Sequence, residues 1–184
     1  MEKLFLSLLS SAILLLFLAV TPIAVLAQEN DGTVSAKLQN GGSYELFWPL
    51  TAGKTMDDPL YFLKLWKEDI GGLFIFNVAK KADYGVMLST KRILEAEKLL
   101  KEEKEDLAVK TLDKALAQLT VARGKFSKVT KTGNDFQLVR TNLINQLSNL
   151  DVFLPKLASL GKADSGNKGE QILKITKQFL GDFE

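Results

Sequence analysis

The sequence predicts an all-α fold, an antiparallel helical hairpin extended to a four- or five-helix bundle. Two observations carry this prediction. Apolar or small residues recur at alternating spacings of four and three within residues 77–129, and a charged run interrupts them in the middle. Such spacing keeps these residues on one face of a helix. Because helices of this length are marginally stable alone in water, we expect the two to pack against each other.

Each helix of the hairpin has its own seam. The first seam comprises Ala82, Val86, Ser89, Ile93, Ala96 and Leu100, and the second comprises Ala108, Leu112, Ala115, Leu119, Ala122, Phe126 and Val129. The charged run 101–106 suits a solvated turn between them, and Asn77 suits the N-cap of the first helix. Gly85 and Gly124 weaken a helix locally, so we expect them to mark close contacts.

Composition limits the chemistry of the chain. Its 184 residues suffice for one domain with tails, and 24 basic against 22 acidic residues leave a charge of only +2. This imbalance is too weak to indicate a nucleic-acid partner. The absence of Cys and His excludes disulfides, Cys/His zinc sites and nucleophile pairs that use a histidine. The sequence therefore indicates no catalytic, cofactor-binding or metal-ligating residue.

Residues 1–27 have the pattern of a signal peptide. A short polar start containing Lys3 precedes an apolar stretch from Leu4 to Val20, and Val25-Leu26-Ala27 suits a cleavage site before Gln28. The alternative is an uncleaved anchor, since about 17 apolar residues are at the lower limit for a membrane span. In either case we expect the remainder outside the cytoplasm, periplasmic or secreted, with membrane contact only through a retained leader.

Residues 28–45 are polar and rich in glycine, which predicts a flexible tether. A strand over residues 33–38 is the alternative, although it has no evident partner. The apolar stretch 46–50 follows. We expect Phe47 and Trp48 to dock on the open side of the helical core, with a partner-binding patch as the second interpretation.

The next segment begins with a helix start, in which Asp58 serves as N-cap and Pro59 as the first helical residue. A broad apolar face follows and is expected to join the core, with a ligand pocket as the alternative. It comprises Leu60, Phe62, Leu63, Leu65, Trp66 and Ile70. Gly71-Gly72 interrupts it, and the apolar run then continues through Leu73-Phe74-Ile75-Phe76 up to Asn77.

Three stretches carry a resemblance to a known family. They are 58–64 (DPLYFLK), 80–83 (KKAD) and 91–96 (KRILEA). Over about residues 45–130 the chain resembles an uncharacterised bacterial family, domain of unknown function 5667. The resemblance implies an extracytoplasmic helical domain, often behind a signal peptide or anchor. It implies no activity and no functional residues.

The C-terminal part predicts two further helices, so that the helical domain covers residues 46–184. A third seam comprises Val139, Leu143, Leu147, Leu150, Leu154 and Leu157. Because Pro155 falls inside it, we expect a kink or an end near Phe153. Residues 161–169 are expected to form a polar loop. Ile172, Ile175, Phe179 and Leu180 mark a short final helix.

These observations favour an extracytoplasmic, non-enzymatic interaction or structural protein of the cell envelope. Its partner would be an envelope protein or polymer, contacted through Phe47, Trp48 and Trp66. The seams could also pair between chains and form a homodimer. The alternative is a small-ligand or cation binding module that uses the aromatic stretch or the acidic turn. An enzymatic role for Glu68 and Asp69 is disfavoured, because adjacent helical residues do not face each other.

Overall fold

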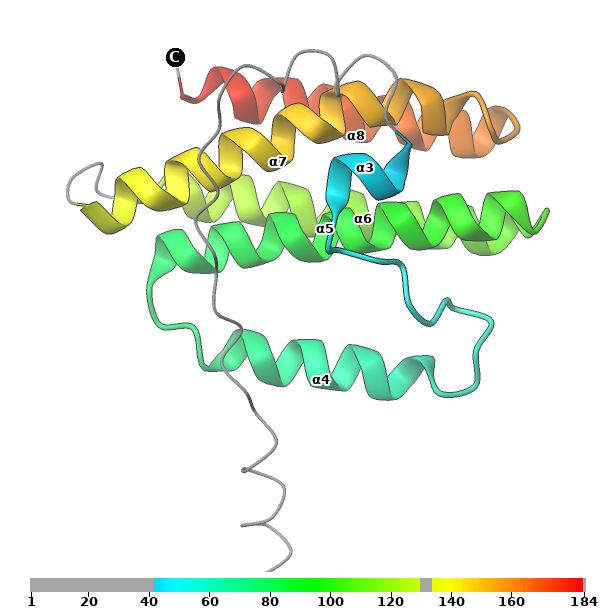
Figure 1. Cartoon of the computed structure of the whole chain (residues 1–184), viewed down its shortest axis with the longest axis horizontal. Helices are drawn as coiled ribbons and strands as arrows, with labels where there is room; N and C mark the ends of the chain where they lie inside the picture. The colour runs from blue at the N-terminus through cyan, green and yellow to red at the C-terminus, as the bar shows by residue number, and fades with distance from the viewer. Residues whose placement is uncertain (1–41, 130–133, 184) are drawn as a thin grey trace, which may run out of the picture. The chain divides into compact units, whose positions relative to one another are not determined.

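A computed structural model describes residues 42–129 and 134–183, which form six helices and no strand (Figure 1). These are α3 (Ser43–Phe47), α4 (Tyr61–Leu73), α5 (Val78–Lys101), α6 (Glu105–Phe126), α7 (Asn134–Ala158) and α8 (Ala163–Gly181). The all-α prediction is confirmed. No helix in the described ranges is long and apolar enough to cross a membrane. The predicted leader, most of the tether and the alternative strand at 33–38 lie outside these ranges.

The hairpin of α5 and α6 has the predicted seams. Their residues are buried, except that Val129 is half-buried. Asn77 caps α5 as expected, because its side chain accepts a hydrogen bond of 3.1 Å from the Lys80 N–H. The chain reverses at Glu102–Lys104, where Glu103 has a positive φ of 59°. The seam residues are therefore buried within one chain.

Only one of the two hairpin glycines lies at a close contact. A Cβ added to Gly85 would lie 3.0 Å from the Cβ of Ala122, whereas one added to Gly124 would meet nothing within 4 Å. Gly85 thus lets α5 and α6 approach each other, as predicted. Gly124 does not serve this purpose.

α7 and α8 pack on the hairpin on the side opposite α4 (Figure 1). All six residues of the third seam are buried. The predicted kink or end near Phe153 does not terminate the helix, because α7 continues through Pro155 to Ala158. Phe153, Leu154 and Leu157 are buried on both sides of the exposed proline. Packing of this apolar face outweighs the loss of one helical hydrogen bond at proline.

The predicted polar loop at 161–169 is wrong, since α8 begins at Ala163. Gly169 lies against α7, where an added Cβ would be 3.4 Å from the Cβ of Ala158. The Glu105 side chain accepts hydrogen bonds from the N–H groups of Lys162 (3.1 Å) and Ser165 (3.4 Å) at the start of α8. Close packing and this cap from α6 offset the low helix propensity of the glycines.

α3 begins within the last residues of the predicted tether and lies on the core. Leu46 and Phe47 are buried, and the Phe47 ring packs edge-on against Phe153 at 5.4 Å between centroids. The Asn149 side chain donates a hydrogen bond of 2.8 Å to the Leu46 carbonyl. The apolar stretch therefore docks on the helical core through Leu46 and Phe47. The prediction is wrong for Trp48, which is 65% exposed.

Candidate functional site

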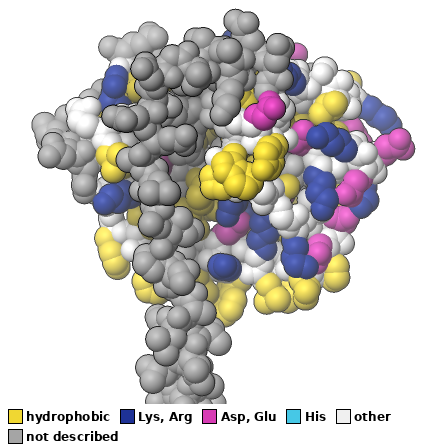
Figure 2. All heavy atoms as spheres, in the orientation of Figure 1, with side chains coloured by type: hydrophobic (Ala, Val, Ile, Leu, Met, Phe, Trp, Pro, Cys, Tyr) yellow, Lys and Arg dark blue, Asp and Glu magenta, His cyan; other side chains and the backbone are white. Residues whose placement is uncertain are grey.

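Helix α4 turns its polar side toward the hairpin and its apolar side away from it. Tyr61, Lys64 and Glu68 share the inner side and contact α5. The other side continues past the helix end into the connection to α5, and we call it the outer face. It comprises Leu60, Phe62, Leu63, Trp66, Leu73, Phe74, Phe76 and Val78, all exposed. Hydrophobic side chains line the lower edge of the molecule in Figure 2, where α4 lies.

The exposure of these residues is large. The exposed fraction is 62% for Phe62, 65% for Trp66 and 85% for Phe76. The prediction that this apolar run joins the core is therefore wrong for most of its residues, although Leu65 and Ile70 are half-buried. Large aromatic side chains gathered in one exposed patch typically mark an interaction surface.

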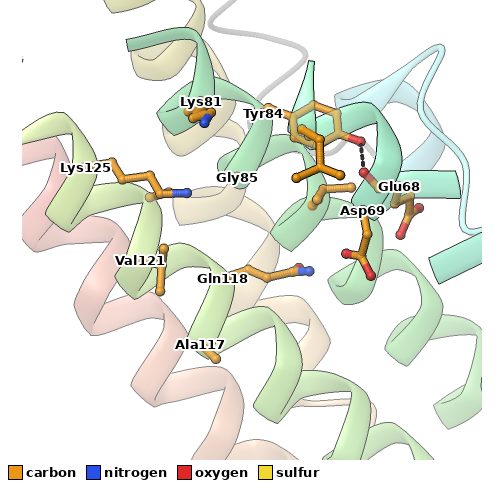
Figure 3. A pocket seen from close by; sticks show the side chains of 13 residues that line it. Glu68, Asp69, Lys81, Tyr84, Gly85, Ala117, Gln118, Val121 and Lys125 are labelled. Atoms are coloured by element: carbon orange, nitrogen blue, oxygen red, sulfur yellow. Dashed lines mark hydrogen bonds between the residues drawn. The ribbon is translucent and has the colours of Figure 1, made fainter. Parts of the chain in front are cut away.

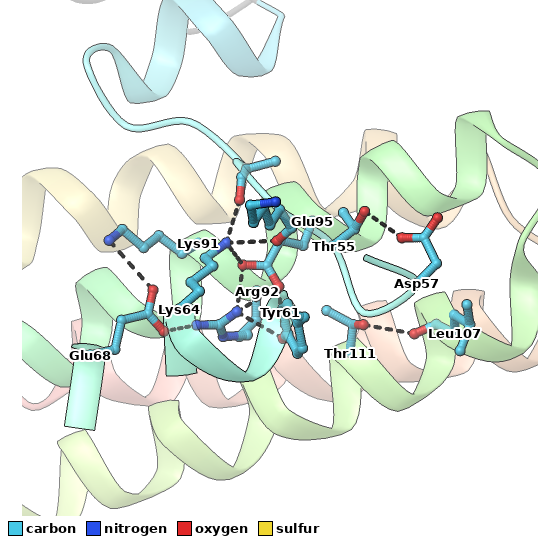
Figure 4. Close-up of polar contacts among 12 residues, drawn as sticks. Thr55, Asp57, Tyr61, Lys64, Glu68, Lys91, Arg92, Glu95, Leu107 and Thr111 are labelled. Atoms are coloured by element: carbon cyan, nitrogen blue, oxygen red, sulfur yellow. Dashed lines mark hydrogen bonds and ion pairs between the residues drawn. The ribbon is translucent and has the colours of Figure 1, made fainter. Parts of the chain in front are cut away.

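A buried ionic network explains why α4 has this orientation. Arg92 of α5 is fully buried and lies between the carboxylates of Glu95 and Glu68 (Figure 4). Its Nη1 donates to the Tyr61 hydroxyl at 2.9 Å and to Glu95 Oε2 at 2.6 Å, and its Nη2 pairs with Glu68. The Tyr61 hydroxyl donates in turn to Glu95 Oε2 at 3.0 Å.

Two lysines complete the network. The Lys64 ammonium pairs with Glu95 and donates to the Lys54 carbonyl at 2.9 Å, which ties α4 to the segment before it. Lys91 lies 3.6 Å from Glu68 Oε1. Burial lowers the pKa of both Lys64 and Lys91. Burial, and then the nearby Glu95 carboxylate, raise the pKa of Tyr61 to about 12.

The network favours one rotation of α4 about its own axis. Arg92 and Glu95 have no solvent contact, so each needs its partners. If α4 turned its apolar side inward, Arg92 would lose Glu68 and the Tyr61 hydroxyl, and Glu95 would lose Lys64. The Arg92–Glu95 pair would then stay buried with too few polar partners. Most polar atoms of this cluster contact one another, so the cluster holds α4 on α5, while Glu68 also lines the cleft described below.

The two glycines of α4 provide a second anchor. The Tyr84 hydroxyl donates to the Glu68 carbonyl at 2.8 Å, and its ring passes over the helix. Cβ atoms added to Gly71 and Gly72 would lie 3.0 and 3.3 Å from the Tyr84 side chain. The glycines thus permit this contact. Beside it lies a cleft of about 440 Å³, into which Asp69, Gln118 and Lys125 reach (Figure 3).

A larger cavity of about 530 Å³ lies between α3, α5 and α7. Trp48 lines it and is 65% exposed, while Phe47 beside it is buried. The cavity also has polar groups, namely Asp83 and the amides Asn142, Asn145, Gln146 and Asn149. Burial raises the pKa of Asp83, which accepts a hydrogen bond of 2.8 Å from Gln146.

The predicted contact residues therefore lie in three settings. Trp66 is on the outer face, Trp48 is at the cavity near α3, and Phe47 is in the core. The acidic turn, within the charged run 101–106, forms ion pairs in which Lys104 contacts Glu102 of the turn and Asp57 of the segment before α4. The described residues contain no group of three carboxylates that could hold a metal ion.

Sequence reasoning missed that Phe62, Leu73, Phe74 and Phe76 join Trp66 on one exposed surface. The sequence of the inner side of α4 does contain a pattern that predicts this arrangement. Tyr61, Lys64 and Glu68 are spaced three and four residues apart, so they form a polar stripe complementary to the Arg92 and Glu95 pair.

Comparison with known proteins supports the resemblance seen in the sequence. The model of the family described as Domain of unknown function (DUF5667) matches residues 53–156, more than half of the chain. No curated protein and no solved structure matches. The stretches 58–64 and 91–96, which carry the resemblance, meet in the buried network through Tyr61, Lys64, Arg92 and Glu95.

Proposed function

We propose that this chain, which belongs to the DUF5667 family, is a non-enzymatic interaction protein of the cell envelope that binds its partner through the outer face. One observation supports the proposal above all others. The chain leaves eight large apolar side chains exposed along α4 and the connection to α5, and uses buried charges to keep them there.

The stability of the domain alone does not explain this arrangement. A buried ionic network is often no more stabilising than apolar residues of similar volume. Had the apolar side of α4 faced the hairpin, the domain would have gained hydrophobic burial worth roughly 1.5–3 kcal/mol for each large side chain. An exposed apolar face is instead consistent with burial against a partner.

The non-enzymatic and extracytoplasmic parts of the proposal rest on other observations. Arg92 pairs with both Glu95 and Glu68, which supports a structural rather than a catalytic role for these charges. The apolar stretch 4–20 has the pattern of an export signal. Protease treatment of intact cells tests the location, and resistance of the tagged protein until the cytoplasmic membrane is opened would contradict it.

The binding proposal is tested by photo-crosslinking in intact cells. A photoreactive phenylalanine analogue replaces Trp66 or Phe62 on the outer face, and Gln171, exposed on α8, in the matched control. We expect a discrete adduct from the outer-face positions and none from the control. Equal or absent labelling at all three positions would contradict a specific role for this face.

A second candidate function is the binding of a small ligand in the cavity near α3. Its amide side chains and the exposed Trp48 favour this function, because amides and an aromatic ring suit a molecule with hydroxyl groups and an apolar face. A thermal-shift screen of soluble saccharides tests it. A rise in melting temperature that disappears in Asn142→Leu would support the candidate, and a screen without any shift would count against it.

A further inference from the structure

We propose that the partner of the outer face is the surface of an anionic phospholipid bilayer, on which α4 lies as an interfacial helix. This inference rests on the proposed function and specifies its partner. It follows from the chemistry of the face, the charges beside it and the place of the apolar stretch 4–20 in the sequence.

The outer face has the composition of a membrane-interface helix. Four of its eight residues are aromatic, one of them Trp66, and the others are leucine or valine. Tryptophan and phenylalanine favour the boundary between lipid headgroups and acyl chains. None of the eight side chains carries a charge, so the face offers no ion pair that would fix a protein partner in one register.

The inner polar residues of α4 have partners within the domain. Lys64 and Glu68 pair within the network, and Tyr61 is buried there. Insertion of the outer face by a few ångströms would therefore bury apolar side chains without removing those charges from their partners. The rest of the domain would remain in water, in the place that the polar side of an amphipathic helix usually takes.

Lysines lie on α4 and in the cleft beside it. Lys67 follows Trp66 on α4, while Lys81 and Lys125 line the adjoining cleft. The carboxylates lining the cleft are Glu68, which is paired with Arg92, and Asp69. Because Glu68 is already paired with Arg92, Lys67, Lys81 and Lys125 stand against the single carboxylate of Asp69 here, and this balance of charge suits anionic headgroups.

The chain also brings the domain near a membrane. Residues 21–41 separate the apolar stretch 4–20 from the first described residue, Gly42. At about 3.4 Å per residue they span at most about 70 Å. A retained leader would thus hold α4 within reach of the bilayer, and after cleavage the outer face would be what keeps the domain there.

The two tryptophans allow a test with the full-length chain, because they belong to different parts of the fold. Trp48 follows α3 and Trp66 belongs to α4 (Figure 1). In Trp48→Phe only Trp66 fluoresces, and in the matched control Trp66→Phe only Trp48 does. Each variant is reconstituted into vesicles of phosphatidylglycerol and phosphatidylcholine, with and without brominated acyl chains. The readout reports on α4 even when the leader itself is inserted.

We expect a blue shift of Trp66 emission and strong quenching by brominated lipid in phosphatidylglycerol vesicles. Quenching should weaken in phosphatidylcholine alone and at high salt, and Trp48 should show none. Adding Phe62→Ser and Phe74→Ser should lower the quenched fraction by about tenfold or more, since each replaces a large apolar side chain.

Unquenched Trp66 in every vesicle would overturn the lipid inference. If photo-crosslinking at position 66 still gave a protein adduct, the outer face would bind a protein or a second copy of the chain, and the proposed function would stand. If neither lipid nor protein were found at this position, both proposals would fail. Equal quenching of Trp48 and Trp66 would also overturn the inference, because it would show contact without a preferred face.

Discussion

Arg92 is the residue on which the orientation of α4 depends most directly. It is fully buried, and its guanidinium group contacts Tyr61, Glu68 and Glu95 at once. It lies one position before Ile93 of the first seam, so a seam analysis places it on the flank of the helix. Its burial depends on α4, a separate element, and for this reason the sequence pattern alone did not reveal it.

Replacement of Arg92 by methionine should destabilise the domain. The change leaves the Glu95 and Glu68 carboxylates near one another without their shared cation, which costs about 3–5 kcal/mol for a buried pair. Urea unfolding measures the change in free energy. Arg123→Met is the matched control, because its pair with Asp182 is partly exposed and should cost about 1 kcal/mol or less. Equal losses would show that the network contributes no more than a surface ion pair.

Replacement of Tyr61 by phenylalanine tests the electrostatics of the same cluster. Burial and Glu95 raise the pKa of Tyr61 from 10.0 to about 12 in the folded protein. A raised folded-state pKa contributes stability below the unfolded pKa that is lost as pH rises to the folded one. The stability advantage of the wild type over Tyr61→Phe should therefore shrink between pH 10 and 12. A constant difference over this range, measured by urea unfolding, would contradict the assignment.

At the scale of elements, the helices that pack by apolar seams were predictable and those fixed by other contacts were not. The seams of α5, α6 and α7 were identified from the sequence because their apolar residues recur with the period of a helix, and this spacing places them on one buried side. α8 begins earlier than predicted because Gly169 packs on Ala158 and Glu105 caps it from another helix. The outer face of α4 was mistaken for core. The apolar pattern shows that the helix has an apolar side, but the contacts of the polar side with Arg92 and Glu95 decide which side faces the hairpin.

The hairpin crossing provides a prediction at this scale. Gly85→Val should destabilise the domain by about 1–3 kcal/mol, because the added side chain overlaps Ala122 and forces α5 and α6 apart. Gly124→Val is the matched control. Its added atoms meet nothing within 4 Å, so we expect a change close to zero. Thermal unfolding of the two variants measures the difference, and similar losses would contradict a close approach at Gly85.

For the molecule as a whole, the residues of the outer face contribute little to folding and are available for interaction. The core includes the seams of α5, α6 and α7, Leu46 and Phe47 of α3, and Ile172 and Phe179 of α8. The exposed residues of α4 add little to it. Phe62→Ser with Trp66→Ser should therefore leave the midpoint of unfolding nearly unchanged. The same double variant should lose the crosslinked adduct formed from position 74. A large loss of stability would instead place these residues in the core.

The most direct measurement of the central claim uses the absence of cysteine from the chain, since a single introduced cysteine is a unique label. The rate of maleimide labelling is compared for Trp66→Cys, for the exposed reference Gln171→Cys and for the buried reference Leu143→Cys in the purified folded protein. The structure predicts that Trp66→Cys reacts as fast as Gln171→Cys. Protection equal to that of Leu143→Cys would show that the apolar side of α4 faces inward, and would contradict the proposed interaction surface.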